Sequence, residues 1–190
     1  MNVIKTAHTN FPVIDLIKNR WSARSFSEKP ISADDLKTIL EAGTWAFSAN
    51  NEQPWRVIAA HRGSETFNKI VDCLMPGNSP WAKHAAALVV SIAKTDFEKE
   101  GHPANLTAEH DLGAFNATLV LQARSMEIFG HPMGGFDKQK TKELFSLPEN
   151  FKPLAVIALG YLDDAEKLDE PYKSRELTAR SRKGLNEIML

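Results

Sequence analysis

The sequence predicts a single domain in which helices cover both faces of a central β-sheet. Three short apolar runs, at residues 55–60, 86–93 and 154–160, are too short for core helices and are bounded by turn residues, as strands are. The last two do not alternate apolar with polar residues, so both sides of those strands must be covered. The domain therefore combines buried strands with helices above and below them.

The N-terminal part predicts two amphipathic helices and a loop. The first is expected over residues 12–20, because apolar residues recur there at three- or four-residue spacing: Phe11, Ile14, Ile17 and Trp21. Ser32 is suited to cap a second helix, which should end near Gly43. Residues 47–53 then form a polar loop that enters the first strand.

The segment at residues 106–129 predicts a long helix that is apolar nearly all round. Such a helix belongs in the core or in a subunit interface. After Tyr161 the chain becomes highly charged and ends in Ile188, Met189 and Leu190. This stretch is either a disordered tail or an arm that wraps a partner subunit, with its few apolar residues as anchors.

Composition narrows the function classes. The chain of 190 residues is 43% hydrophobic and 25% charged, which is typical of one soluble domain spanning residues 1–190. A net charge of -1 argues against nucleic-acid binding by bulk electrostatics. The single cysteine, Cys73, cannot form an internal disulfide or a paired-cysteine zinc site, so we expect a reducing cytoplasm and no metal. The sequence has no apolar run long enough to span a bilayer, so we expect no membrane role.

Basic residues recur in two segments that are far apart along the chain. RWSAR contains Arg20, Ser22 and Arg24, and ARSRKGL contains Arg180 and Arg182. A guanidinium group binds phosphate well because its planar fork donates two parallel charge-assisted hydrogen bonds. The alternative is that both segments are solvated basic surface, with RWSAR at the negative end of a helix dipole.

Three further segments could form turns or line a ligand site. FSANNEQPW reads as a polar turn into a strand, with Pro54 setting the entry angle, and GNSPW at residues 77–81 reads as a surface turn. In GHPMGGFD, the adjacent Gly134 and Gly135 would let a ligand approach the backbone closely, although a tight turn after a helix is the alternative. We assign His131 no catalytic role.

Together these segments resemble the FMN-dependent nitroreductase family in its RxSxR, PSxxNxQPW and C-terminal RxR motifs. HDLGAFNATLVLQA is also similar to the family, so the resemblance extends from Arg20 to the C-terminus. One departure is Phe47, which stands where the family usually has proline. The resemblance implies an α+β fold with a central, mainly antiparallel sheet flanked by helices. It also implies an intertwined homodimer in which a C-terminal arm, residues 176–190, embraces the partner.

The resemblance implies a role for each candidate residue. The FMN phosphate and ribityl chain would be held by Arg20, Ser22, Arg180 and Arg182, and Arg24 would lie near flavin N1 and O2. Asn78 would bond the pyrimidine ring, and the backbone N–H of Gly134 would donate to flavin N5. Trp21, Met133 and Gly135 would also line the FMN site, while Ser48 and Asn51 would reach the FMN bound mainly by the other subunit.

The implied activity is an FMN-dependent NAD(P)H oxidoreductase. In a ping-pong mechanism, NAD(P)H would reduce tightly bound FMN at N5, and a small-molecule acceptor such as a nitroaromatic or a quinone would then take two electrons. Arg24 and the Gly134 N–H would tune the flavin, and no side chain would act as a nucleophile. The alternatives are a dehydrogenase, dehalogenase or enone or aldehyde reductase of the same family, and a flavin-binding protein without catalysis.

Overall fold

The computed structural model of the protein describes residues 3–98 and 104–190, so residues 1–2 and 99–103 of the expected single domain lie outside the described part. Its centre is a four-stranded sheet in the order β1-β2-β4-β3, in which every neighbouring pair is antiparallel. The strands are β1 (Trp55–His61), β2 (Ala87–Lys94), β3 (Phe129–Met133) and β4 (Phe151–Gly160). The three expected strands and the antiparallel sheet are confirmed.

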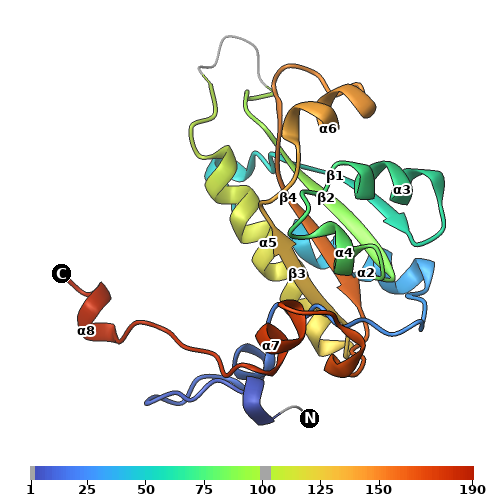
Figure 1. Cartoon of the computed structure of the whole chain (residues 1–190). Helices are drawn as coiled ribbons and strands as arrows, with labels where there is room; N and C mark the ends of the chain where they lie inside the picture. Colours follow the sequence, from blue (N-terminus) through green and yellow to red (C-terminus); the bar gives the residue numbers. More distant parts are fainter. Residues whose placement is uncertain (1–2, 99–103) are drawn as a thin grey trace.

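Helices cover the sheet on both sides (Figure 1). One face packs against α2 (Ala33–Thr44) and α5 (Ala108–Ser125), and the other against α3 (Glu65–Asp72) and α4 (Ser79–Ala82). Strand β2 shows why its sequence is apolar apart from Ser91 and Lys94. Leu88, Val90 and Ile92 lie in the core beside α3 and α4, while its alternate residues, Ala87, Val89 and Ala93, lie in the core beside α5. The predicted two-sided burial is confirmed.

Helix α2 begins and ends where the sequence predicts. The Ser32 hydroxyl accepts a hydrogen bond of 3.0 Å from the Asp35 backbone N–H, which caps the first turn. Gly43 lies in the last turn, where a Cβ would come within 2.6 Å of the Phe115 ring of α5. Glycine therefore lets these two helices approach closely.

Two predicted helices are shorter than expected. Instead of residues 12–20, α1 covers Asp15–Asn19, because the chain is extended at both Ile14 and Arg20. The apolar residues of its predicted buried face, Phe11, Ile14 and Ile17, are exposed. The long segment at 106–129 forms α5 only as far as Ser125, because Glu127 takes a left-handed conformation with φ of 60° that ends the helix.

The strand β3 was not predicted, since Gly130 and Pro132 within it are uncommon in strands. The strand order explains how they fit. β3 is at the edge of the sheet and pairs with β4 alone, so Pro132 need not donate to a second strand. Gly130 packs against Val120 of α5, where a Cβ would come within 2.8 Å of a Val120 methyl group.

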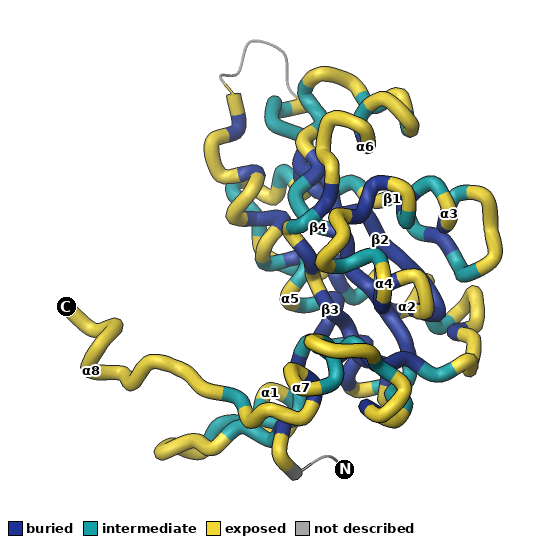
Figure 2. Tube along the Cα trace, viewed as in Figure 1, coloured by how far each residue is buried: buried dark blue, intermediate teal, exposed yellow. Residues whose placement is uncertain are grey.

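The C-terminal region packs on the rest of the protein in its first part and is exposed to solvent in its last part. After β4 come η3 (Ala165–Lys167), α7 (Tyr172–Leu177) and α8 (Leu185–Ile188). Three further short helices lie earlier in the chain: η1 (Val3–Lys5), η2 (Ala49–Asn51) and α6 (Lys138–Leu144). Figure 2 shows that α7 packs on the body of the protein, whereas the chain beyond it is exposed except at Arg180, which is half-buried. Among the described residues, no helix combines the length and apolarity that crossing a membrane requires.

Candidate functional site

The RWSAR segment is extended, and this explains the spacing of its polar residues. Alternate side chains of an extended chain point to opposite sides. Trp21 and Ala23 are therefore buried, while Arg20, Ser22 and Arg24 are half-buried and face the other way. The segment thus presents two guanidinium groups and a hydroxyl on one side.

Trp21 contributes differently from its polar neighbours. Its indole is 6% exposed, packs 4.5 Å from the Phe129 ring and donates from Nε1 to Glu176 across 3.3 Å. The side chain is therefore part of the core.

Arg20 lies near both arginines of the tail. Its pKa is lowered, chiefly by burial and then by repulsion from the positive charges of Arg180 and Arg182. In the described part of the chain, the Arg20 guanidinium has no hydrogen-bonding or ion-pair partner. Residues more than 150 positions apart therefore form one cationic cluster, which we define as Arg20, Arg180 and Arg182.

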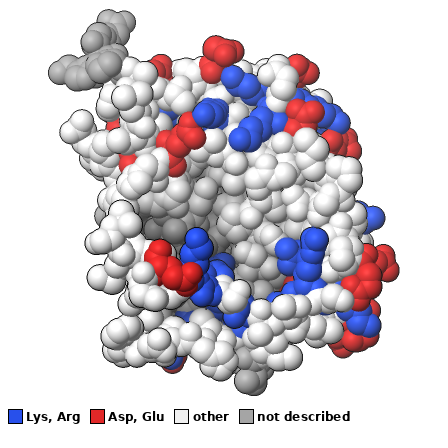
Figure 3. Space-filling view, turned by 60° about the vertical axis from the view of Figure 1, so that its left-hand side comes forward, with Lys and Arg blue, Asp and Glu red and all other residues white. Residues whose placement is uncertain are grey.

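Arg180 is fixed by the backbone of the N-terminal region. Its Nη1 donates to the Lys5 carbonyl at 3.0 Å and to the Lys18 carbonyl at 2.7 Å, whereas Arg182 is exposed and bonds its neighbour Ser181. In the face of the molecule drawn in Figure 3, Lys and Arg side chains gather beside a hollow. The cationic cluster suits a dianionic ligand group such as a phosphate.

The segments at Asn78 and Gly134 also meet. Asn78 precedes α4 and donates from Nδ2 to the Gly135 carbonyl at 2.9 Å. Gly134 is exposed, and a Cβ at this position would meet no other atom within 4 Å. Met133 is buried in the core beside the turn. The backbone at Gly134 is therefore open to a ligand, whereas the Met133 side chain is engaged in packing.

His131 joins this turn to RWSAR. It is 8% exposed, and its Nδ1 donates to the Ala23 carbonyl at 2.9 Å. Its ring packs 4.4 Å from the Trp81 ring, and the Arg24 guanidinium lies 5.7 Å from a Trp81 ring on α4. The pKa of His131 is lowered to about 4, chiefly by burial, while the hydrogen bond to Ala23 opposes the shift and the nearby positive charges of Arg24 and Arg20 add to it. His131 is thus a neutral structural residue at pH 7.

The FSANNEQPW loop has a strained conformation that its own side chains stabilise. Asn50, Asn51 and Gln53 have φ values of 53°, 55° and 52°, which are uncommon for residues other than glycine. The Ser48 hydroxyl accepts from the Gln53 backbone N–H at 3.0 Å and closes the loop. Asp111, 2% exposed on α5, accepts from the Ala49 N–H at 3.1 Å.

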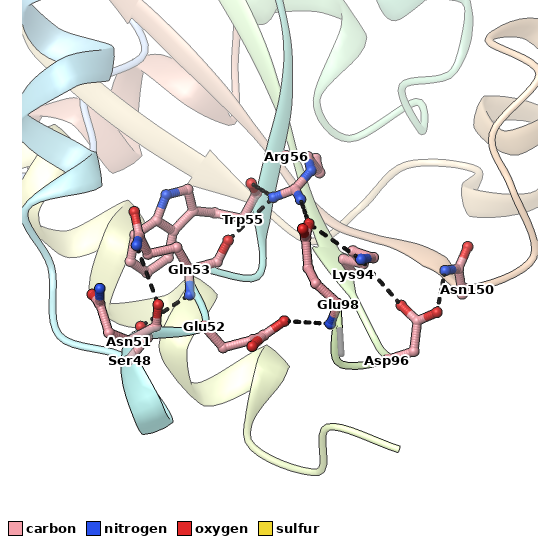
Figure 4. A network of polar contacts seen from close by, with 10 residues as sticks. All are labelled: Ser48, Asn51, Glu52, Gln53, Trp55, Arg56, Lys94, Asp96, Glu98 and Asn150. Carbon is pink, nitrogen blue, oxygen red and sulfur yellow. Dashed lines mark hydrogen bonds and ion pairs between the residues drawn. The ribbon is translucent and has the colours of Figure 1, made fainter. Parts of the chain in front are cut away.

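A network of polar side chains joins this loop to the ends of β2 and β4 (Figure 4). Glu52 accepts from the Glu98 backbone N–H at 2.7 Å, and Glu98 in turn pairs with Arg56 at 2.8 Å. Lys94 extends the network to Asp96, which accepts from Asn150. The loop is therefore bonded to the neighbouring strand ends, and it lies beside a cavity of about 380 Å³ lined by Thr44, Trp45, Ala46, Asn51 and Gln53.

The structure divides the predicted site residues into two groups. Arg124 of α5 bonds the Asn19 carbonyl beside RWSAR, whereas Asp111 of α5 holds the loop that contains Ser48 and Asn51. These two positions on α5 are about 20 Å apart at the rise of an α-helix. Within one chain, Ser48 and Asn51 therefore lie away from the cationic cluster.

A family comparison fits this arrangement. A model of the Nitroreductase family matches residues 17–75 and 64–161, which contain RWSAR, the FSANNEQPW loop, Asn78 and the Gly134 turn. The chain belongs to the nitroreductase family. Arg180 and Arg182 lie beyond the matched residues, so their place beside Arg20 comes from the structure.

Individual relatives agree with this assignment. A protein of Archaeoglobus fulgidus, provisionally named NADH dehydrogenase/NAD(P)H nitroreductase, is 30% identical over 161 residues, which are 83% of this chain and 89% of the relative. The crystal structure of an oxidoreductase containing FMN is 34% identical, with a TM-score of 0.92 over 96% of this chain and 93% of that one. A protein from Desulfovibrio desulfuricans, provisionally named a nitroreductase and solved in complex with FMN, has the same fold, with a TM-score of 0.75 at 20% identity over 96% of this chain and 97% of that one.

Two buried residues hold the segments of this nitroreductase candidate site in place, and the sequence did not predict their roles. Glu176 lies beneath RWSAR, where it accepts from Trp21 and from the Arg24 backbone N–H. Lys5 is 6% exposed and donates from Nζ to the carbonyls of Arg175 and Thr178. Neither residue stands in a local motif, and both act on segments more than 150 positions away, so short-range spacing carries no signal for them.

Proposed function

We propose that this nitroreductase family member is an FMN-dependent NAD(P)H oxidoreductase whose acceptors are nitroaromatics, quinones or related small molecules. The observation that carries the proposal is the half-buried guanidinium of Arg20, which lies near two further arginines and has no anionic partner in the described part of the chain. Like charges in a partly desolvated site repel one another, and a bound phosphate would offset that repulsion.

The candidate residues would match the parts of FMN. Arg20, Ser22, Arg180 and Arg182 would hold the phosphate and the ribityl chain. Arg24 would place a fixed positive charge at the pyrimidine edge, and the exposed backbone N–H of Gly134 would donate to N5. Asn78 already donates to Gly135, so its Oδ1 is the atom left to accept a hydrogen bond from the flavin.

When bound, FMN supplies the two-electron chemistry, with N5 receiving hydride from NAD(P)H and the acceptor being reduced in a separate half-reaction. The chain's own residues bind and orient the reactants. The Arg24 guanidinium favours negative charge in its neighbourhood, and burial lowers its pKa while Glu176 opposes that effect. No side chain of the site needs to act as a nucleophile.

A homodimer would complete the site. Ser48 and Asn51 lie away from the cationic cluster of their own chain, so a second chain would have to bring them to the flavin. Large apolar side chains remain exposed on one chain, among them Phe11, Trp45, Phe47, Leu106, Ile188 and Met189. Exposed apolar surface of this kind favours association. Phe47, in place of the usual proline, is 70% exposed and packs 5.8 Å from the His110 ring.

The test is an absorption spectrum of the purified protein before and after anaerobic addition of NADH or NADPH. We expect a flavin spectrum that either nicotinamide bleaches and that a quinone restores. A protein that neither carries FMN nor takes it up would contradict the proposal. Bleaching by dithionite but not by NADH or NADPH would indicate the alternative of a flavin-binding protein without catalysis.

A specialised reductase, dehydrogenase or dehalogenase of the same family is the second candidate. The cavity of about 380 Å³ beside Trp45, Asn51 and Gln53 favours a particular acceptor, because it offers an exposed indole together with amide groups. Rates for the reoxidation of reduced enzyme by nitroaromatics, quinones, enones and halogenated aromatics would distinguish the candidates. A quinone rate far below that of another acceptor class would favour the specialised enzyme.

A further inference from the structure

Glu176 is a buried carboxylate beneath the proposed flavin site. It is 3% exposed, on α7. Its Oε1 accepts from the Trp21 indole N–H at 3.3 Å, and its Oε2 accepts from the Arg24 backbone N–H at 3.2 Å. One side chain from the tail therefore holds two residues of RWSAR, one through its side chain and one through its backbone.

The helix that carries Glu176 is itself fixed. Lys5 donates from Nζ to the Arg175 carbonyl at 2.8 Å and to the Thr178 carbonyl at 2.7 Å, at the C-terminal end of α7. A cation at this end of a helix binds carbonyl groups that have no partner within the helix. Lys5 therefore fixes the end of the helix from which Glu176 reaches Trp21 and Arg24.

A buried carboxylate is unfavourable unless charges and hydrogen bonds compensate it, and an apolar side chain of similar size could fill the same volume. Packing alone therefore does not account for an acid here. Both hydrogen bonds use Glu176 as an acceptor, and its negative charge acts on Lys5 and Arg24. The charge itself is the property that a neutral substitute would lack.

Building on the proposed function, we propose that Glu176 is a positioning residue of the flavin site. Its two hydrogen bonds fix the extended RWSAR backbone, so that Arg20, Ser22 and Arg24 all face the cofactor. Its negative charge, buried against the Arg24 backbone, also reduces the positive potential that Arg24 exerts on the flavin. The reduced flavin gains negative charge, so Glu176 keeps the two-electron reduction potential of the bound flavin lower than it would otherwise be.

The test uses Glu176→Gln, which keeps the size of the side chain and removes its charge. Fluorescence titration of the FMN-free protein should show FMN binding about tenfold weaker, because a hydrogen bond to a charged group is lost. An anaerobic equilibrium titration of the FMN-loaded protein should show a higher reduction potential. A tenfold shift in favour of the reduced form corresponds to about 30 mV for a two-electron couple.

A matched control is Glu170→Gln, because Glu170 also contacts α7 but, among the described residues, its hydrogen bonds go to Ser174 of that helix and not to RWSAR. It should leave the potential at the wild-type value. Glu176→Asp retains the charge and should have a potential close to wild type even if FMN binds less tightly. If Glu176→Gln does not fold, Glu176→Met, which fills the same volume without charge, is expected to raise the potential in the same way.

The outcomes separate this inference from the function on which it rests. A wild-type protein that binds no FMN would contradict the proposed function. If wild type binds FMN but Glu176→Gln has the wild-type potential, the inference is wrong whether or not binding is weaker, since loosened packing alone could weaken binding. An equal rise in potential for Glu170→Gln would also overturn it, because the effect would then come from the whole helix.

Discussion

The Arg180 guanidinium donates a hydrogen bond of 2.7 Å to the Lys18 carbonyl, which lies 162 positions earlier in the chain. The same Nη1 also bonds the Lys5 carbonyl. The base of the tail is therefore attached to the N-terminal region of its own chain, directly beside Arg20. Residues 181–190, beyond this attachment, are exposed and are the part of the tail that would reach a second protomer in the proposed homodimer.

Replacing Arg20 or Arg182 with alanine should weaken FMN binding. Each substitution removes charge-assisted hydrogen bonds worth about 1.5 to 3 kcal/mol, so FMN should bind roughly 10- to 150-fold less tightly. Fluorescence titration of the FMN-free variants measures this directly. Lys183→Ala is the matched control, because Lys183 is an exposed cation next to Arg182. Full retention of FMN by Arg20→Ala after extensive dialysis would show that the cationic cluster does not bind the phosphate.

Two truncations should separate the two parts of the tail. Removal of residues 176–190 deletes Glu176 and Arg180, so we expect loss of FMN, of stability and of the dimer. Removal of residues 183–190 deletes only exposed residues and should weaken dimerisation while a single chain keeps its cationic cluster. Light scattering coupled to size-exclusion chromatography, together with flavin absorbance, measures both properties. A yellow, stable dimer without residues 176–190 would refute the arm model.

His131 should make the protein less stable in mild acid. Its folded-state pKa of about 4 lies below the ordinary value of 6.5, so the unfolded chain binds the proton more readily. The folded state is therefore favoured where His131 is neutral in both states. This contribution to the free energy of unfolding is complete above about pH 6.5, decreases as the pH falls and is lost near pH 4. It amounts to roughly 3 kcal/mol.

His131→Phe provides the comparison for this pH dependence, because phenylalanine can still pack on Trp81 but cannot titrate. Urea unfolding of both proteins between pH 4 and pH 7 gives the difference in their stability. The free energy of unfolding of wild type, relative to that of His131→Phe, should fall by roughly 3 kcal/mol between pH 7 and pH 4. A difference that is constant with pH would mean that His131 is not the group that is kept neutral.

Gly43→Ala should destabilise the contact between α2 and α5. The added Cβ would lie 2.6 Å from the Phe115 ring, so one helix must move, at a cost of about 1 to 3 kcal/mol. Gly77→Ala is the control, since a Cβ at Gly77 meets nothing within 4 Å. Thermal unfolding of the two variants compares them. Equal midpoints would indicate that the helices adjust freely.

Short-range patterns predicted much of this protein. The apolar runs predicted β1, β2 and β4, and Ser32 and Gly43 marked the ends of α2. The RxSxR spacing is informative because an extended chain places alternate side chains on one side. The roles of the individual site residues toward FMN remain predictions, to be tested by the substitutions above.

Long-range geometry accounts for what the sequence did not predict. Residues 129–133 form a strand despite Gly130 and Pro132, because they lie at the sheet edge, a position that no local pattern encodes. Glu176 is one acid in a charged stretch, and its importance depends on Trp21, 155 positions away. Helix α1 was predicted too long because the spacing of its apolar residues was taken to mark a buried helix face. Phe11, Ile14 and Ile17 are in fact exposed, and the helix covers only Asp15–Asn19.

The bond between Glu176 and RWSAR also affects how the protein matures. Residues 20–24 leave the ribosome early, but the acid that fixes them is made near the end of translation. The nascent chain can assemble its sheet before this acid emerges, whereas the cofactor pocket has to wait for the final segment. If FMN binds as proposed, its capture would therefore follow the synthesis of Glu176, and a chain interrupted shortly before Glu176 would contain the whole sheet and still lack the acid that fixes residues 20–24.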